Sequence, residues 1–242
     1  LETNYTQIST KGIQVTATNE AVTSAGRNNE MAYQVAKAAK ELKRDMETAL
    51  LSNVAKTAGN ATTARKLGGC PTWYETNVDA GTSGSGAGNG AIRTDGTQRA
   101  FTEDQLKGIL VSCYNEGGNP NMIMVNAFNK QKLSGFTGGS TRFDAAEDRR
   151  LITSIDVYES DFGTMQVSPN RFIRGANGTA AKIGQDAHIL DMEYWAVSFL
   201  RDFALQTPAQ TADADQRFMV AEYTLESRNE KASGLITDLT TS

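Results

Sequence analysis

The longest regular pattern in the chain runs from residue 27 to residue 53 and predicts one uninterrupted helix. Apolar side chains recur along it every three or four residues, which is the spacing of a single helix face. These are Met31, Val35, Ala38, Ala39, Leu42, Met46, Ala49 and Leu50. At about 1.5 Å of rise per residue the helix is about 40 Å long, roughly twice the ordinary length. A stripe that long and narrow needs an equally long partner to cover it.

A matching partner is predicted near the other end of the chain, at residues 218–229. There Met219, Ala221, Tyr223 and Leu225 alternate with more polar residues, which is the two-residue period of a strand with unlike faces. Twelve residues at about 3.3 Å each again span about 40 Å. A long helix packed on a long strand from the far end of the chain predicts an elongated body rather than a globule.

Residues 3–18 are predicted to be extended, with few large apolar groups. Ile13 and Val15 fall in a different phase from Tyr5 and Ile8, and a bulge or bend near Gly12 would reconcile the two phases. We expect this segment to leave the body and to find no pairing partner in the rest of the chain.

The middle of the chain, residues 101–205, is predicted to be a compact α+β module. Thr102 and Gln105 form a capping box at the start of a helix, and Asn126 is placed to cap another that ends at Gly135. Between them lies a short buried strand, 122–125. Two hairpins are expected, one from 152–158 with 164–167 and one from 188–190 with 194–200.

Composition excludes several classes of function. The 242 residues carry a net charge of −4, which argues against a protein whose main task is gripping phosphate backbones. The longest apolar runs are too short for a membrane helix. Cys70 and Cys113 have no metal-like spacing and are expected to be buried thiols. The single histidine, His188, is expected to be structural, so we predict no catalytic residue, metal site or cofactor.

A glycine-rich stretch, GTSGSGAGNG at 81–90, is expected to be a flexible loop. A phosphate-binding role would need GxGxxG or GxxxxGK[ST] after a strand, and neither pattern fits. The stretch therefore predicts no nucleotide site.

Several long segments carry a resemblance to a known family. They are TNYTQISTKGIQVTATNEAV, AGRNNEMAYQVAKAAKELKRDMETALLSN, GGNPNMIMVNAFNKQKLSGFTGGSTRF, VYESDFGTMQVSPNRF and AEYTLESRNEKASGLITDL. Together they resemble the major capsid (major head) proteins of tailed bacteriophages across nearly all of the chain. The resemblance implies the Hong Kong 97-type fold, an α+β architecture with a spine helix, a peripheral domain, an axial domain and an extended loop.

Carried onto this chain, the resemblance implies the following division. Residues 1–25 are the returning strand of the extended loop, 26–100 the peripheral domain with the spine helix, 101–205 the axial domain, and 206–242 the return to the peripheral domain. The N-terminal arm and the outgoing strand of the loop are then expected upstream of Leu1.

The implied function is that of a shell subunit. Many copies assemble as hexamers and pentamers into an icosahedral or prolate head that encloses double-stranded DNA without sequence-specific binding. Further implied partners are a portal and scaffolding or decoration proteins, with no membrane partner. The protein is expected in the virion, after assembly in the host bacterial cytoplasm. Its mild acidity suggests an inner wall that repels DNA weakly.

Residues on the presumed loop, spine helix and long strand are our subunit-interface candidates: Tyr5, Ile8, Lys11, Ile13, Val15, Arg27, Lys37, Arg44, Glu222 and Arg228. Two alternatives stay open. One is the same fold as the shell of an encapsulin-like compartment, which would enclose cargo protein instead of DNA. The other is an enzyme with its site in the 101–205 module, which would be a monomer or small oligomer with a ligand pocket.

Overall fold

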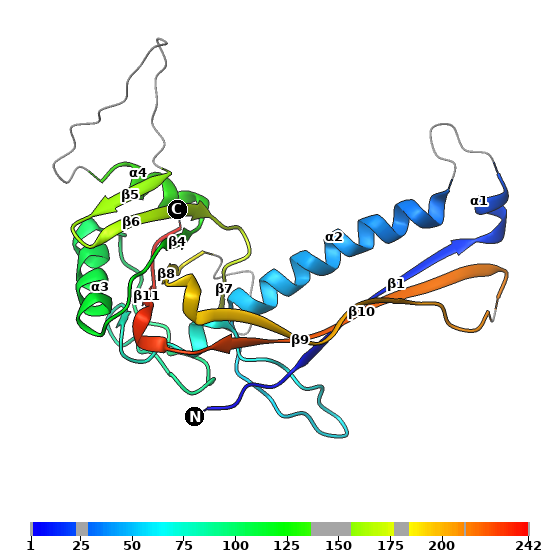
Figure 1. The fold of residues 1–242 in the computed structure, drawn as a ribbon, viewed down its shortest axis with the longest axis horizontal. Helices are drawn as coiled ribbons and strands as arrows, with labels where there is room; N and C mark the ends of the chain where they lie inside the picture. Colours follow the sequence, from blue (N-terminus) through cyan, green and yellow to red (C-terminus); the bar gives the residue numbers. More distant parts are fainter. Residues whose placement is uncertain (1, 23–28, 137–155, 177–183, 211, 242) are drawn as a thin grey trace, which may run out of the picture.

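A compact lobe and a long arm make up the molecule (Figure 1). The computed structural model describes residues 2–22, 29–136, 156–176, 184–210 and 212–241. The arm contains one long helix lying along a narrow sheet, and the lobe contains a second sheet with two helices. The elongated body predicted from the sequence is therefore present.

The long helix, α2, runs from Glu30 to Leu51. Its N-cap is Asn29, whose side chain accepts a hydrogen bond from the backbone N–H of Ala32 at 2.7 Å. The predicted face is buried, with Leu42 almost fully inaccessible. The prediction extended the helix through residue 53, but Ser52 and Asn53 instead form strand β2, which pairs with β7.

The sheet of the arm has three antiparallel strands in the order β1-β10-β9. Strand β10, Ala214–Ser227, is central, between β1, Gln7–Thr16, and β9, Trp195–Gln206. The predicted alternating residues of β10 join Leu42, Met46 and Leu50 of α2 in one core cluster. The contact between the two distant segments is thus confirmed.

Strand β1 differs from the prediction in two respects. It pairs within the chain, in an unbroken register from Gln7↔Tyr223 to Thr16↔Ala214. There is no bulge at Gly12. Ile8 is exposed to solvent, whereas Ile13 and Val15 pack against α2, so the two phases are the two faces of one regular strand. The sheet's irregularity lies between β10 and β9, near Glu222.

The lobe is built on a six-stranded mixed sheet in the order β3-β11-β8-β4-β6-β5. These strands are Val78–Asp79, Gly234–Ile236, Ala187–Leu190, Met122–Val125, Gly163–Pro169 and Val157–Ser160. Helices α3, Glu103–Asn115, and α4, Ala127–Ser134, share one core cluster with Ile123 and Val125 of β4. Both predicted caps are present, the box at Thr102 and the Asn126 side chain.

Short elements complete the chain. They are α1 Ala17–Ala21, β2 Ser52–Asn53, η1 Cys70–Thr72, β7 Arg174–Ala176, η3 Met192–Tyr194 and η4 Glu230–Ala232. No described helix is both long enough and apolar enough to cross a membrane.

One of the two predicted hairpins is confirmed. Strands β5 and β6 pair antiparallel, while residues 152–155 of that prediction lie outside the described residues. The second hairpin was wrong. Both edges of β8 are already occupied by β11 and β4, and after η3 the chain leaves the lobe as β9 to pair with β10. The end of the predicted 101–205 module therefore belongs to the arm.

The glycine-rich stretch is close-packed rather than free. A Cβ atom on Gly81 would lie 2.1 Å from the carbonyl oxygen of Thr97, and the N–H of Gly81 donates to Asp238 at 3.0 Å. Ser85 bridges to Thr94 across the same loop. The glycines allow two backbone segments to approach closely, which composition alone could not distinguish from flexibility.

Candidate assembly surfaces

Three of the ten interface candidates have side chains that are buried inside the subunit. Ile13 and Val15 are buried in a core cluster with Met31 and Ala38 of α2. Glu222 is 2 % exposed and has partners from its own chain. Burial of these three side chains within the subunit does not fit a contact with a neighbour. The segment around Ile13 and Val15 was expected to project from the body, and it pairs with β10 instead.

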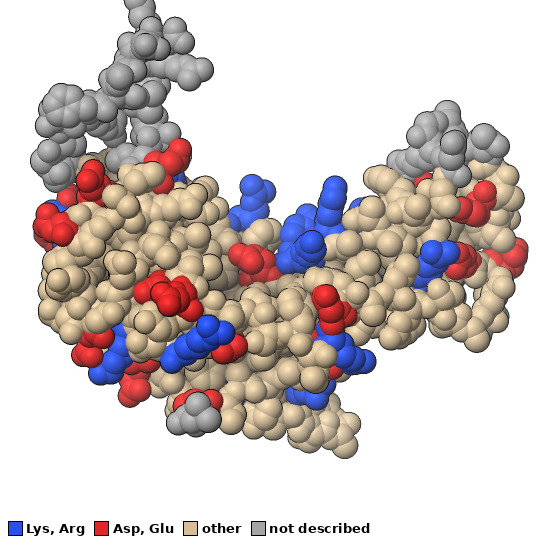
Figure 2. Space-filling model, viewed as in Figure 1, with Lys and Arg blue, Asp and Glu red and all other residues tan. Residues whose placement is uncertain are grey.

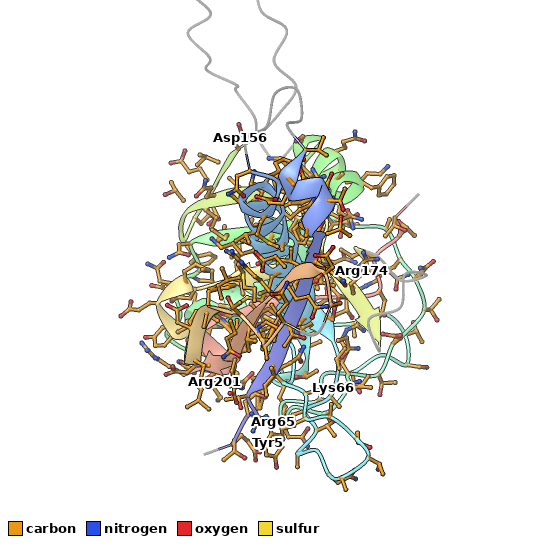
Figure 3. All side chains as sticks on the ribbon, turned by 90° about the vertical axis from the view of Figure 1, so that its right-hand side faces the viewer. Tyr5, Arg65, Lys66, Asp156, Arg174 and Arg201 are labelled. Atoms are coloured by element: carbon orange, nitrogen blue, oxygen red, sulfur yellow. The ribbon has the colours of Figure 1, made fainter. Side chains whose placement is uncertain are left out.

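Glu222 ties four segments together at the irregularity of the arm sheet. Its carboxylate accepts hydrogen bonds from Thr6 at 2.8 Å, from Nε of Arg201 at 2.7 Å and from Arg65. In Figure 3, Arg65 and Arg201 both lie in the lower part of the view. The hydrogen bond from Thr6, followed by the Arg201 contacts, holds the pKa of Glu222 below its ordinary value. The carboxylate is thus a structural anchor.

The other candidates keep exposed surface. Tyr5, Ile8, Lys37, Arg44 and Arg228 are all exposed. Lys11 is partly exposed and pairs with Glu41 of α2 at 2.9 Å, while Arg228 pairs with Glu226 at 2.9 Å. Arg27 lies outside the described residues. The exposed residues remain predicted contacts between subunits.

The sequence prediction missed an apolar surface on β9. Val197, Phe199, Leu200 and Leu205 are exposed along this edge strand, and Leu200 is 66 % accessible. The arrangement leaves large apolar side chains in water, which is typical of interaction sites. The sequence did contain an indication of this surface. Residues 195–206 carry large apolar groups at both odd and even positions, so a strand there has apolar side chains on both faces.

A second missed surface lies on the lobe. The rings of Tyr114, at the end of α3, and Phe162, in the β5–β6 turn, stack with centroids 4.8 Å apart and both remain exposed. Val111 and Val157 are exposed as well. Aromatic residues at accessible positions are the usual anchors of protein–protein interfaces.

Inside the lobe, a buried arginine holds together loops that are distant in sequence. The Arg93 guanidinium is fully inaccessible and contacts Asp186 at 2.6 Å, Asp95 at 3.0 Å and Asp238 at 3.3 Å. Burial, together with the neighbouring Asp238 and Asp95 carboxylates, raises the pKa of Asp186 to about 6 although Arg93 opposes the shift. Nothing in the spacing of these residues predicted the cluster.

His188 is also fully buried, on strand β8. Its Nδ1 lies 3.8 Å from Sγ of Cys70, and its ring lies against Tyr74 with centroids 6.1 Å apart. Burial lowers the pKa of His188 to about 3, so the ring is neutral at physiological pH. Both thiols are free and buried, and burial raises the pKa of each to about 12. Among the described residues no group of three His, Cys, Asp or Glu side chains could hold a metal ion.

Comparison with known proteins connects these surfaces to a family. The profile of the family described as "SU10 major capsid protein" matches residues 1–240. One curated relative, the major capsid protein of Escherichia phage Phieco32, is 42 % identical over 57 residues, which is 24 % of this chain and 16 % of that protein.

Solved structures with similar folds include both phage capsids and a compartment shell. The cyanophage A-1(L) capsid matches with a TM-score of 0.61 at 11 % identity, over 97 % of this chain and 78 % of that chain. Gordonia phage Cozz matches with a TM-score of 0.59 at 10 % identity, over 99 % and 71 %. The holo-SrpI encapsulin complex from Synechococcus elongatus PCC 7942 matches with a TM-score of 0.58 at 9 % identity, over 97 % and 74 %.

At 9–11 % identity these structures establish the fold and do not separate a capsid from an encapsulin. The separation comes from the sequence, because the family profile covers almost the whole chain and is that of a capsid protein. The chain therefore has the Hong Kong 97-type fold and belongs to the SU10 major capsid protein family.

Proposed function

We propose that this chain is the structural shell subunit of a tailed-phage head, of which many copies assemble around double-stranded DNA. The observation that carries the proposal is the family match over residues 1–240. The form of the molecule supports it, because a long arm and a compact lobe give one subunit several surfaces that can meet different neighbours (Figure 1). Closed symmetric assembly multiplies such contacts, so that each one need not be strong.

The proposed division of the subunit follows the arm and the lobe. The arm, with α2, β1, β9 and β10, is the peripheral domain, and the lobe is the axial domain that surrounds the capsomer centre. Relative to the division expected from sequence, β1 and β9 join the peripheral domain because both pair with β10. Strands β3 and β11 move to the axial domain, because they belong to the sheet of the lobe.

The proposed partners are other copies of the subunit, arranged as hexamers and pentamers, a portal, and scaffolding or decoration proteins. Assembly is proposed to take place in the cytoplasm of the host bacterium. The enclosed DNA is not read by sequence in this proposal, since none of the surfaces described above presents an element that reads base edges in a groove.

A compartment shell is the second candidate, and the similarity to an encapsulin complex is the observation that favours it. The contents of the particle separate the two. Particles of the protein that carries this chain should be seen by electron microscopy and should contain nuclease-protected DNA. Particles filled with protein and free of DNA would support the compartment, and a monomer or small oligomer in a sizing experiment would contradict both.

A further inference from the structure

The solvent-facing side of α2 carries a row of side chains of one charge. At about 100° per residue, the direction opposite the buried Leu42 falls on Tyr33, Lys37, Lys40 and Arg44, all of them exposed. We call the three charged residues, Lys37, Lys40 and Arg44, the outer row. Figure 2 shows lysine and arginine side chains gathered over α2, in the concave region between the lobe and the arm.

The positive charges of the outer row are only partly compensated by the acidic residues of α2. Glu41 pairs with Lys11 of β1 at 2.9 Å and is only at the 4.0 Å limit from Lys37. Glu47 accepts a hydrogen bond from Asn170 at 2.8 Å. Within the described part of the chain no carboxylate lies within 4.0 Å of Lys40 or Arg44. Opposite charges four residues apart on an exposed helix form i,i+4 pairs, and among the described residues this row forms one, the long Lys37–Glu41 contact at 4.0 Å.

We propose that the outer row binds the phosphate backbone of the enclosed DNA, so that this side of α2 faces the interior of the shell. This inference rests on the proposed function, and it assigns Lys37 and Arg44 to DNA in place of the contacts between subunits predicted for them from the sequence. From Lys37 to Arg44 the row spans about 10.5 Å along the helix, at about 1.5 Å per residue. A DNA duplex carries one negative charge per about 1.7 Å of its axis, so several phosphates face a row of this length.

The contact is weak for each subunit and independent of sequence. Three cations release about 2.7 counterions, at about 0.9 for each phosphate neutralised. Contacts to phosphates carry no base information. The row departs from the weakly repulsive inner wall expected from the net charge of −4, because a net charge does not tell where the charges lie.

A charge-matched pair of variants tests the proposal in solution. The row variant is Lys37→Gln, Lys40→Gln and Arg44→Gln, and the control is Lys66→Gln, Lys107→Gln and Arg228→Gln, which removes the same charge from exposed positions elsewhere. Unassembled protein is titrated with a fluorescent 30-base-pair duplex at several salt concentrations. The expected slope of log Kobs against log salt is about −2.7 for the wild type and the control, and near zero for the row variant. Equal slopes for the wild type and the row variant would overturn the proposal. Displacement of the duplex by polyglutamate at the same charge concentration as DNA would also overturn it, and would point to an acidic protein partner.

Lysine acetylation of whole particles separates failure of this inference from failure of the proposed function. In DNA-filled particles Lys37 and Lys40 should be acetylated several-fold more slowly than in particles emptied of DNA, while Lys107 should react equally in both. Equal labelling of Lys37 and Lys40 in filled and emptied particles would defeat the inference alone. Absence of particles, or particles without DNA, would defeat the proposed function as well.

Discussion

Replacing Arg93 with methionine should remove the guanidinium that contacts three carboxylates inside the lobe. Asp186 and Asp238 are each about 1 % exposed, so both lose a partner in a site that water does not reach. Removing one member of a buried ion pair costs about 3–5 kcal/mol, and here a single substitution removes the cation from two buried carboxylates, of which Asp238 keeps its hydrogen bonds from Gly81 and Thr237. We therefore expect a loss in the free energy of unfolding at the upper end of that range, a large part of the roughly 5–15 kcal/mol typical of a domain.

Arg99→Met is the matched control. Arg99 pairs with Asp79 at 2.8 Å, but the two side chains are 25 % and 31 % exposed, so the expected cost is at most about 1 kcal/mol. Urea unfolding of the unassembled protein, followed by tryptophan fluorescence, measures both variants, because Trp73 and Trp195 lie in or against the arm-side core cluster.

The dependence on pH makes the test specific. A carboxyl group whose pKa is higher in the folded than in the unfolded state contributes stability at low pH and loses it as pH rises through the folded pKa. Asp186 already has its pKa raised to about 6, and loss of Arg93 raises it further. The cost of Arg93→Met should thus be clearly smaller at pH 5 than at pH 7.5. Equal costs for the Arg93 and Arg99 variants, or a cost that does not change with pH, would refute the reasoning.

Three further predictions follow from the same structure. Leu42→Asp should lower the free energy of unfolding by several kcal/mol and prevent particle formation, since it places an unpaired charge between α2 and the sheet. The control Ala36→Asp, on the exposed side of α2, should assemble normally, and electron microscopy measures both outcomes. Cys70 and Cys113 should resist iodoacetamide at pH 8 in native protein and react after denaturation, as mass spectrometry would show; rapid native labelling would contradict their burial. The wild type should lose stability between about pH 4 and pH 6–7, by about 3 kcal/mol for an Asp186 pKa moved from 3.8 to about 6, and Asp186→Asn should remove this loss. Thermal melts that show the same pH profile for wild type and variant would count against the prediction.

Among the surfaces, those made by exposed residues of a single helix were within reach of the sequence. The stripe on α2 fixes which side is buried, and Lys37 and Arg44 on the other side were accordingly named as candidates. The exposed apolar residues of β9 could not be predicted from the sequence. Their exposure depends on α2, which covers β10 and β1 and leaves the edge strand β9 accessible. Glu222 was misjudged for the converse reason, since its burial is created by Arg65 and Arg201 from other parts of the chain.

The chain by itself determined α2, the alternation within β10, and the caps at Thr102 and Asn126. Each depends on side chains within a few residues of one another, where backbone hydrogen bonds and the periods of helix and strand operate. Only the tertiary structure decided the partner of β1, because its register joins residues up to 216 positions apart (Gln7 and Tyr223). The Arg93 cluster belongs to the same class, since no local rule selects which distant carboxylates a buried cation will meet.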